Sequence, residues 1–167
     1  GGVGKTTLAQ KIFNDKKLEG IFDKHVWVCV SKDYTKDSLL RKVLCDMKIR
    51  YEQGESVGEL ESKLALSIAE ESFFLVLDDV WQPEAWTDLL RTLHAAATGI
   101  ILVTTRDNTI APIIGVDHTH RVDLMSADVG WELLWRSMNI KEEKQVQNLR
   151  DIGIEIVQKC GGLPLTL

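Results

Sequence analysis

The sequence predicts an α/β fold in which a parallel sheet lies between two layers of helices, a three-layer α/β/α arrangement. Short β-prone runs alternate along the chain with segments whose apolar residues recur at helical spacing. The runs at residues 26–30, 73–77 and 100–104 are almost continuously apolar, which is typical of parallel strands buried on both faces. Strands separated by helices imply right-handed βαβ units and therefore a parallel sheet.

Helices are expected in the intervals between these runs. A short helix with one apolar face follows residue 5, and residues 39–47 and 60–68 place apolar side chains three and four positions apart. Residues 51–58 contain glycine and charged side chains and are expected to form a loop. Pro83 fits the first turn of a further helix, because a backbone N–H is not needed there.

Toward the C-terminus the pattern becomes helical. A weaker strand is expected at residues 121–124, followed by a helix capped by Ser126 and a last helix that stops at a Gly-Gly pair. We therefore expect one domain at residues 1–125 and the beginning of a helical domain at residues 126–167.

The composition is that of an ordinary globular protein, with 167 residues, 44% of them hydrophobic, and a net charge of −5. This acidic balance argues against a general electrostatic grip on nucleic acid, and no apolar run is long enough to span a bilayer. The cysteines match no metal or redox spacing, so we expect buried free thiols at Cys29 and Cys45 in a reducing compartment. The tryptophans, Trp81 among them, are expected to lie in the core.

The chain begins with the letters GGVGKTT (residues 1–7), which make up most of the phosphate-binding pattern G-x-x-x-x-G-K-[ST]. Backbone N–H groups in such a glycine turn point at an anion, and the positive end of the following helix dipole adds to the attraction. Lys5 can reach the β- and γ-phosphates of a nucleotide, and the Thr6 hydroxyl can bind Mg²⁺. The alternative is a glycine-rich turn that happens to end in Lys-Thr.

The first glycine of this pattern, and the strand that leads into the loop, would precede residue 1. We therefore expect that the chain begins inside its own motif and that the sheet lacks its first strand. Because that strand lies in the interior of such sheets, its loss should expose the edges of its neighbours. The expectation is that these 167 residues alone fold poorly or aggregate.

Two aspartates, Asp78 and Asp79, directly follow the second apolar run. Ligands of open α/β sheets bind at the carboxyl ends of the strands. We therefore expect Asp78 to hold Mg²⁺ together with Thr6, and Asp79 to orient or deprotonate an attacking water molecule. Taken alone, the same residues could equally form an acidic turn after a core strand.

Arg106 follows the third run. If this strand lies beside the one that carries Asp78, the Arg106 guanidinium would face the γ-phosphate and could report whether a third phosphate is present. The alternative is a surface arginine at a strand end. A further segment, CGGLPL at residues 160–165, is on physical grounds only a helix end with a proline stop.

These elements, in this order and at these distances, resemble the nucleotide-binding NB-ARC domain of plant disease-resistance proteins with leucine-rich repeats. The resemblance covers essentially the whole chain and rests on five motifs: Walker A (residues 1–7), F-D-x-x-x-W-V-x-V-S (22–31), kinase-2 (75–81), G-x-x-I-x-x-T-T-R (99–107) and G-L-P-L (161–165). Trp81 after the aspartates and the F-D block are similar to the non-Toll/interleukin subclass, whose members usually carry an N-terminal coiled coil.

The resemblance implies a P-loop NTPase that acts as a switch, closed and resting with ADP, open and signalling with ATP. Carried over by position, it implies phosphate contacts from Gly2, Val3, Gly4, Lys5, Thr6 and Thr7. It further implies catalytic roles for Lys5 and Asp79, Mg²⁺ ligands at Thr6 and Asp78, third-phosphate sensing by Arg106 and packing of Pro164 near the adenine.

The implied setting is cytoplasmic, with no direct contact to nucleic acid or membrane. The implied partners are an adenine nucleotide, coiled-coil and leucine-rich-repeat domains absent from these residues, and further copies of the protein on activation. The sequence departs from the family at two points: the Met-His-Asp motif of the second helical subdomain is missing, and Thr166 stands where alanine is more usual.

Other functions stay open from the sequence. A turnover ATPase that drives remodelling is one, although fast enzymes of this class usually place glutamate where Asp79 stands. Because aspartate reaches less far, we expect slow hydrolysis and tightly held ADP. A small-molecule or nucleoside kinase would need an acceptor site for which the sequence gives no sign, and the intact motifs argue against a nonfunctional gene copy.

Overall fold

The computed structural model describes residues 2–93, 98–115 and 118–164, so Gly1 and residues 165–167, with Thr166, lie outside the described residues. The chain forms two compact units. We call Thr6–Thr119 the sheet unit, and Gly1–Lys5 together with His120–Leu167 the helical unit. The domain border expected between residues 125 and 126 stays a prediction.

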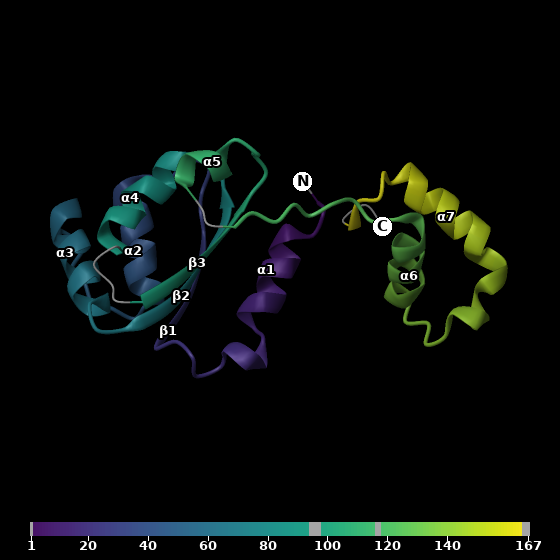
Figure 1. The fold of residues 1–167 in the computed structure, drawn as a ribbon, viewed down its shortest axis with the longest axis horizontal. Helices are drawn as coiled ribbons and strands as arrows, with labels where there is room; N and C mark the ends of the chain where they lie inside the picture. The colour runs from purple at the N-terminus through teal and green to yellow at the C-terminus, as the bar shows by residue number, and fades with distance from the viewer. Residues whose placement is uncertain (1, 94–97, 116–117, 165–167) are drawn as a thin grey trace. The chain divides into compact units, whose positions relative to one another are not determined.

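In the part of the chain that the structure describes, three parallel strands form the sheet, in the order β1-β2-β3 (Figure 1). They are β1 (Lys24–Cys29), β2 (Ser72–Val80) and β3 (Thr98–Thr105). Leu75 in the middle strand lies opposite Val26 on one side and Ile101 on the other. The parallel sheet expected from the apolar runs is confirmed.

Helices cover both faces of this sheet (Figure 1). Because side chains alternate along a strand, Phe73, Leu75 and Leu77 of β2 enter one apolar cluster, and Phe74 and Val76 enter another. The first cluster is closed by α2 (Lys36–Asp46), α3 (Val57–Ile68), α4 (Pro83–Leu93) and α5 (Ile110–Ile114), and the second by α1 (Lys5–Phe13) and the short 3₁₀ turn Lys16–Leu18. The predicted three-layer α/β/α arrangement is confirmed.

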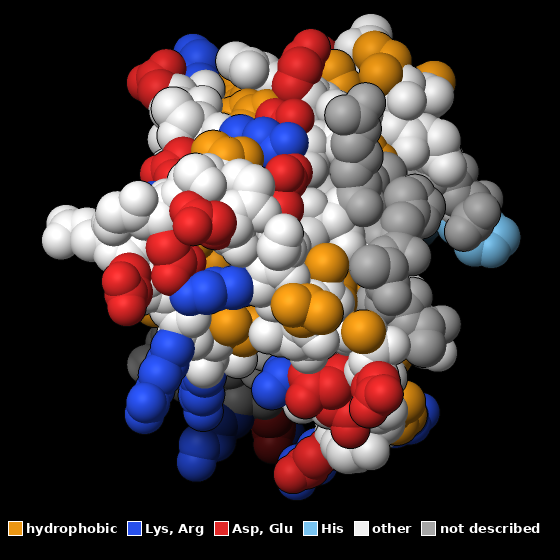
Figure 2. All heavy atoms as spheres, turned by 90° about the vertical axis from the view of Figure 1, so that its left-hand side faces the viewer, with side chains coloured by type: hydrophobic (Ala, Val, Ile, Leu, Met, Phe, Trp, Pro, Cys, Tyr) orange, Lys and Arg blue, Asp and Glu red, His pale blue; other side chains and the backbone are white. Residues whose placement is uncertain are grey.

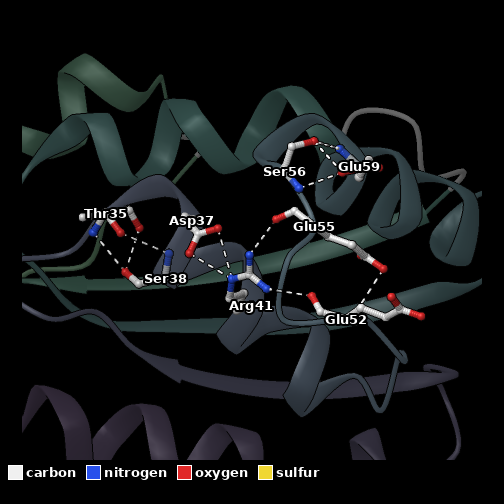
Figure 3. A network of polar contacts seen from close by, with 8 residues as sticks. All are labelled: Thr35, Asp37, Ser38, Arg41, Glu52, Glu55, Ser56 and Glu59. Atoms are coloured by element: carbon white, nitrogen blue, oxygen red, sulfur yellow. Dashed lines mark hydrogen bonds and ion pairs between the residues drawn. The ribbon is translucent and has the colours of Figure 1, made fainter.

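Hydroxyl side chains define where α2 and α3 begin (Figure 3). Thr35 and Ser38 exchange hydrogen bonds at the start of α2, and Ser56 and Glu59 do so at the start of α3. Each pair satisfies backbone N–H groups that a helix leaves without partners. The loop expected over residues 51–58 therefore ends at the Ser56 cap, before its predicted limit.

Arg41 ties this loop to α2 (Figure 3). Its Nε donates to the carboxylate of Asp37, and its terminal nitrogens donate to the backbone carbonyls of Glu52 at 3.1 Å and Glu55 at 2.7 Å. The hydrogen bond from Arg41 lowers the pKa of Asp37 below its usual range. A planar guanidinium can hold several acceptors at once in this way, which a lysine cannot.

Two helices, α6 (Ala127–Ser137) and α7 (Arg150–Lys159), make up most of the helical unit. Ser126 caps α6 as predicted, because its side chain accepts a hydrogen bond from the Val129 N–H at 3.3 Å. Short 3₁₀ turns at Glu143–Gln145 and Gln147–Leu149 lead into α7.

The two helices of this unit meet through glycines. A Cβ placed on Gly153 of α7 would lie 2.2 Å from the ring of Trp131 on α6, and one on Gly130 of α6 would lie 2.3 Å from Val157 of α7. These distances leave no room for a methyl group, so glycine at both positions permits the close approach of α6 and α7.

The strand expected at residues 121–124 is wrong, since these residues form no strand in the structure. A short β-prone run needs a neighbouring strand to pair with, and here Leu124 is 57% exposed while Arg121 pairs only with the nearby Asp123. Sequence preference alone could not tell that none of the described strands pairs with this run.

The expected burial of the cysteines and tryptophans is only partly correct. Cys29 and Cys45 are exposed. Cys29 follows the buried Val28 in β1, and successive side chains of a strand point to opposite faces, whereas Cys45 lies on the side of α2 away from its buried residues. Trp81 is 36% exposed, since it follows β2 rather than lying on a helix stripe. The remaining tryptophans are buried or half-buried: Trp27, Trp86, Trp131 and Trp135.

Candidate functional site

The predicted site residues of the sheet unit gather at the carboxyl edge of the sheet. Asp78 and Asp79 lie near the end of β2, Arg106 directly follows β3, and Thr6 lies in the first turn of α1. Parallel strands end at the same edge, so β2 and β3 deliver their last residues to one place. The structure thus brings together four side chains from three segments that are far apart in the sequence.

Asp78 is the centre of this site and is only 5% exposed. The Thr6 hydroxyl donates to its carboxylate at 3.0 Å (Oδ1) and 3.2 Å (Oδ2), and the Thr104 hydroxyl donates to Oδ1 at 2.6 Å. Within the described part of the sheet unit, no lysine or arginine forms an ion pair with Asp78. Buried charges in proteins are normally paired or bound to a metal, so this carboxylate fits a cation as its partner.

The donor chemistry agrees with Mg²⁺, which prefers oxygen ligands and usually keeps several waters while taking few ligands from the protein. Thr6 and Asp78 offer hydroxyl and carboxylate oxygens side by side. Among the residues that the structure describes, no group of three or more histidine, cysteine, aspartate and glutamate side chains could hold a metal. The two oxygen donors of Thr6 and Asp78 fit an ion that takes few of its ligands from the protein.

Asp79 has an unusual backbone for a residue within a strand. Its φ is +60°, and the pairing of β2 with β3 shifts register between Leu77 and Val80. A positive φ is uncommon for residues other than glycine, but aspartate tolerates this left-handed region better than most. Its N–H donates to the Thr104 hydroxyl at 2.9 Å. β2 continues through both aspartates, because Val80 pairs again with Thr105 of β3.

Arg106 pairs with Asp79. The distance from Arg106 Nε to Asp79 Oδ1 is 3.0 Å, and that from Nη2 to Oδ2 is 3.4 Å. The Trp81 ring lies nearby, with its centre 5.1 Å from the Arg106 guanidinium carbon and 5.3 Å from the Lys32 ammonium. The ion pair is half exposed, so solvent weakens it and a more highly charged ligand could compete for the guanidinium.

A cavity of about 560 Å³ adjoins this ion pair and is lined by Val80, Trp81, Arg106, Asp107, Asn108 and Thr109. Asp107 accepts hydrogen bonds from the hydroxyl and the N–H of Thr109, and these contacts lower the pKa of the Asp107 carboxyl. A second cavity of about 570 Å³, beside α2 and α3, contains none of the predicted site residues. The first cavity is therefore the one relevant to the site.

The glycine loop has the backbone that its motif requires. Gly2 has a φ of +84° and Gly4 a φ of +96°, values that other residues rarely adopt, and α1 begins directly after Gly4. Thr7 is exposed on the first turn of α1. The residues from Gly2 to Lys5, with Val3, belong to the helical unit, as does Pro164. Their contacts with a nucleotide stay predictions.

Sequence reasoning missed two positions. Motif spacing assigns no role to Thr104, although its hydroxyl bonds both aspartates. The sequence predicts only a helix stop at Gly162, yet its carbonyl accepts the Met125 N–H at 3.0 Å, and a Cβ there would lie 2.7 Å from the Met125 carbonyl oxygen. The sequence signal for Gly162 was the Gly-Gly pair itself, whereas no local signal points to Thr104.

Three features define a P-loop NTPase domain. They are a parallel sheet with helices, a glycine turn that leads into a helix, and an aspartate near the end of the central strand that contacts the first turn of that helix. Comparison with known proteins gives the particular family. The model of the NB-ARC domain family matches residues 1–144. This chain belongs to the NB-ARC domain family, whose members bind nucleotides.

Relatives among plant disease-resistance proteins support the same assignment. The chain is 35% identical to disease resistance RPP13-like protein 4 of Arabidopsis thaliana over 100% of the chain and 20% of that protein. It is 35% identical to disease resistance protein RGA2 of Solanum bulbocastanum over 99% of the chain and 17% of that protein. For disease resistance protein RPP13 of Arabidopsis thaliana the identity is 31% over 100% of the chain and 21% of that protein.

The chain therefore spans about a fifth of the length of these relatives. The resemblance to the NB-ARC domains of plant disease-resistance proteins is confirmed.

Proposed function

We propose that this chain is the switch module of a plant disease-resistance receptor, in which ADP and ATP are held with Mg²⁺. The observation that carries the proposal is the contact of Thr6 with Asp78 at 3.0 and 3.2 Å, which joins two predicted motifs 72 positions apart. A buried carboxylate that meets the first turn after a glycine loop is the arrangement by which P-loop proteins hold a metal-bound nucleotide.

The phosphate loop supplies most of the proposed binding contacts. Backbone N–H groups of the loop and the Lys5 ammonium bind the phosphate oxygens, and Thr6 and Asp78 hold the ion. Mg²⁺, when bound, neutralises charge on the β- and γ-phosphate oxygens. The full proposed set of nucleotide contacts is Gly2, Val3, Gly4, Lys5, Thr6, Thr7, Arg106 and Pro164.

Asp79 and Arg106 are proposed to act on the third phosphate. Asp79 orients the attacking water, and Arg106 binds the phosphate. In their ion pair the Arg106 guanidinium and the Asp79 carboxylate bind each other, until Arg106 moves to a more strongly charged partner. Because the release of Arg106 also frees the Asp79 carboxylate, recognition of ATP and its hydrolysis are linked.

Hydrolysis is proposed to be slow and to restore the resting ADP form. The short side chain of Asp79 positions water less well than a glutamate at that place could. Pro164 near the adenine would connect nucleotide state to the angle between the domains, a hinge motion that opens the receptor. Rapid steady-state turnover without any effector would instead favour the remodelling ATPase.

The remaining proposals concern setting and partners. We propose a cytoplasmic receptor with coiled-coil and leucine-rich-repeat domains that forms homo-oligomers on activation. Acidic and basic side chains are interspersed on the face shown in Figure 2, which together with the net charge of −5 supports the absence of direct nucleic-acid contact. Among the described residues, no helix combines the length and the apolar character that a membrane crossing needs.

The test is nucleotide binding by the full-length protein that carries this chain. Lys5→Arg keeps the charge but replaces a compact ammonium by a larger, planar group that does not fit a tight phosphate loop. We expect calorimetry to detect ADP binding by the unaltered protein and none by the variant. Lys11→Arg, at an exposed position of the same helix, is the control and should bind as the unaltered protein does. Normal ADP binding by Lys5→Arg would refute the loop assignment.

A further inference from the structure

The hydroxyl of Thr104 joins the two aspartates of the site. It donates to Asp78 Oδ1 at 2.6 Å and accepts the backbone N–H of Asp79 at 2.9 Å. Thr104 is 8% exposed and lies on β3, whereas both of its partners lie on β2. One buried side chain thus holds both the carboxylate of one aspartate and the backbone of the next.

The chemistry of a hydroxyl fixes the direction of these two bonds. A threonine hydroxyl carries one proton to donate and two lone pairs that accept. Because the Asp79 N–H can only donate, the hydroxyl accepts there, and its own proton goes to the Asp78 carboxylate. Asp78 Oδ1 then receives the Thr104 hydroxyl at 2.6 Å as well as the Thr6 hydroxyl at 3.0 Å, which restricts rotation of the carboxylate.

The bond to the Asp79 N–H has a separate effect. At the register shift between Leu77 and Val80 the regular pairing of β2 with β3 is interrupted, so this N–H would lack a ladder partner. The Thr104 oxygen supplies the missing acceptor, and an unpaired N–H at such a position is costly. Thr104 thereby supports the positive φ of Asp79, which in turn directs its side chain to Arg106.

We propose that Thr104 is a positioning residue for this nucleotide site: it orients the Asp78 carboxylate toward the metal and fixes the backbone that aims Asp79. The inference rests on the proposed function, because it concerns how the same site holds Mg²⁺ and reaches the third phosphate. Thr104 itself touches neither, and acts only through the two aspartates.

The neighbouring Thr105 provides a matched control. Its hydroxyl also bridges the two strands, because it donates to the Val80 carbonyl at 2.8 Å, but it contacts neither the Asp78 carboxylate nor the Asp79 N–H. The Thr105 hydroxyl also accepts the backbone N–H of Asp107 at 3.1 Å. Thr105→Val therefore removes a hydroxyl that links the same strands without touching Asp78 or Asp79. Thr104→Val removes the positioning hydroxyl at nearly constant volume, and Thr104→Ser retains it.

The experiment measures ADP affinity by calorimetry in the full-length protein, with Mg²⁺ and again with a chelator, and ATP hydrolysis in a single turnover. For Thr104→Val we expect the gain in affinity that Mg²⁺ provides to fall about 10–100-fold, as for other residues that orient metal ligands, with slower hydrolysis. Metal-free ADP affinity should stay unchanged. Thr104→Ser should recover the Mg²⁺ dependence, and Thr105→Val should match the unaltered protein.

Three results would overturn the inference: an unchanged Mg²⁺ dependence in Thr104→Val, an equal loss in Thr105→Val, or an equal loss of metal-free binding, which would indicate general damage to the fold. Failure of the proposed function gives a different result. In that case the unaltered protein itself binds neither ADP nor ATP, with or without Mg²⁺.

Discussion

At the scale of single residues, the backbone of Asp79 separates the tasks of two adjacent aspartates. Successive side chains of a regular strand point to opposite faces, so in a regular β2 the sheet alone would set the directions of the Asp78 and Asp79 side chains. The positive φ at Asp79 and the register shift change this. Asp78 stays buried against two hydroxyls, while Asp79 reaches the half-exposed Arg106.

The Asp79 carboxylate carries the charge on which hydrolysis is proposed to depend. Asp79→Asn removes the negative charge and still tolerates a left-handed backbone, whereas a β-branched residue such as valine would add strain at this φ. We expect ATP hydrolysis to slow by about 10²–10⁴-fold while ADP affinity is kept, as for loss of a general base. Single-turnover phosphate release and calorimetry on the full-length protein measure the two quantities.

The control for this variant is Asp33→Asn, an exposed aspartate between β1 and α2. It should hydrolyse ATP at the unaltered rate. Equal hydrolysis rates in Asp79→Asn and the unaltered protein would remove Asp79 from the mechanism.

At the scale of elements, periodicity and capping residues predicted most helices and strands. Ser126 before α6 and Pro83 at the start of α4 mark helix starts by local chemistry, so they could be read from the sequence. The false strand at residues 121–124 and the extension of β2 to Val80 depend on what lies beside the segment. Such effects come from pairing between distant residues, which local patterns do not contain.

The contact between α6 and α7 leaves no room for a side chain at Gly153. Gly153→Ala places a methyl group against the Trp131 ring, and we expect it to destabilise the packing of the two helices by about 1–3 kcal/mol. Hydrogen exchange of backbone amides in residues 127–159 of the full-length protein should speed up accordingly.

Gly58→Ala is the matched control for Gly153→Ala. It also lies in a helix, but nothing lies within 4 Å of an added Cβ, so it should leave the packing of α6 and α7 unchanged. Unaltered exchange in α6 and α7 of Gly153→Ala would show that these helices do not depend on the close approach.

At the scale of the whole molecule, acidic side chains make the fold sensitive to low pH. The pKa is lowered at several carboxyl groups by hydrogen bonds to neighbouring groups. Asp23 is an example: the N–H and hydroxyl of Ser72 donate to its carboxylate, each at 2.7 Å, and lower its pKa. These bonds link the start of β1 to the start of β2.

The sign of the effect follows from linkage. Because the folded pKa of Asp23 lies below the unfolded value, the unfolded chain binds more protons in acid. The stabilisation is present above the unfolded pKa of about 4 and is lost as the pH falls through the folded value. We expect the midpoint temperature of thermal unfolding to fall as the pH is lowered below about 4. In Asp23→Asn it should fall less steeply, because this side chain has no carboxyl group to protonate. Parallel pH profiles of the two proteins would contradict this role of Asp23.

The sequence predicted most residues of the site, but not all of the hydrogen bonds and ion pairs that join them. Motif spacing led to Thr6, Asp78 and Asp79, and the structure does bring Thr6 to Asp78. The ion pair of Arg106 with Asp79 and the bonds of Thr104 depend on the register between β2 and β3, which the sequence does not state. A threonine in a strand carries no local sign that its hydroxyl is used.

The position of Trp81 gives the molecule an optical signal of its own. Indole emission depends on nearby charge, and the ring of Trp81 lies 5.1 Å from the same guanidinium that is proposed to leave for a third phosphate. Movement of Arg106 should therefore change the fluorescence of this ring, and Trp81→Phe identifies its share of the emission. Opening of the pair could then be timed by rapid mixing, with no dye attached.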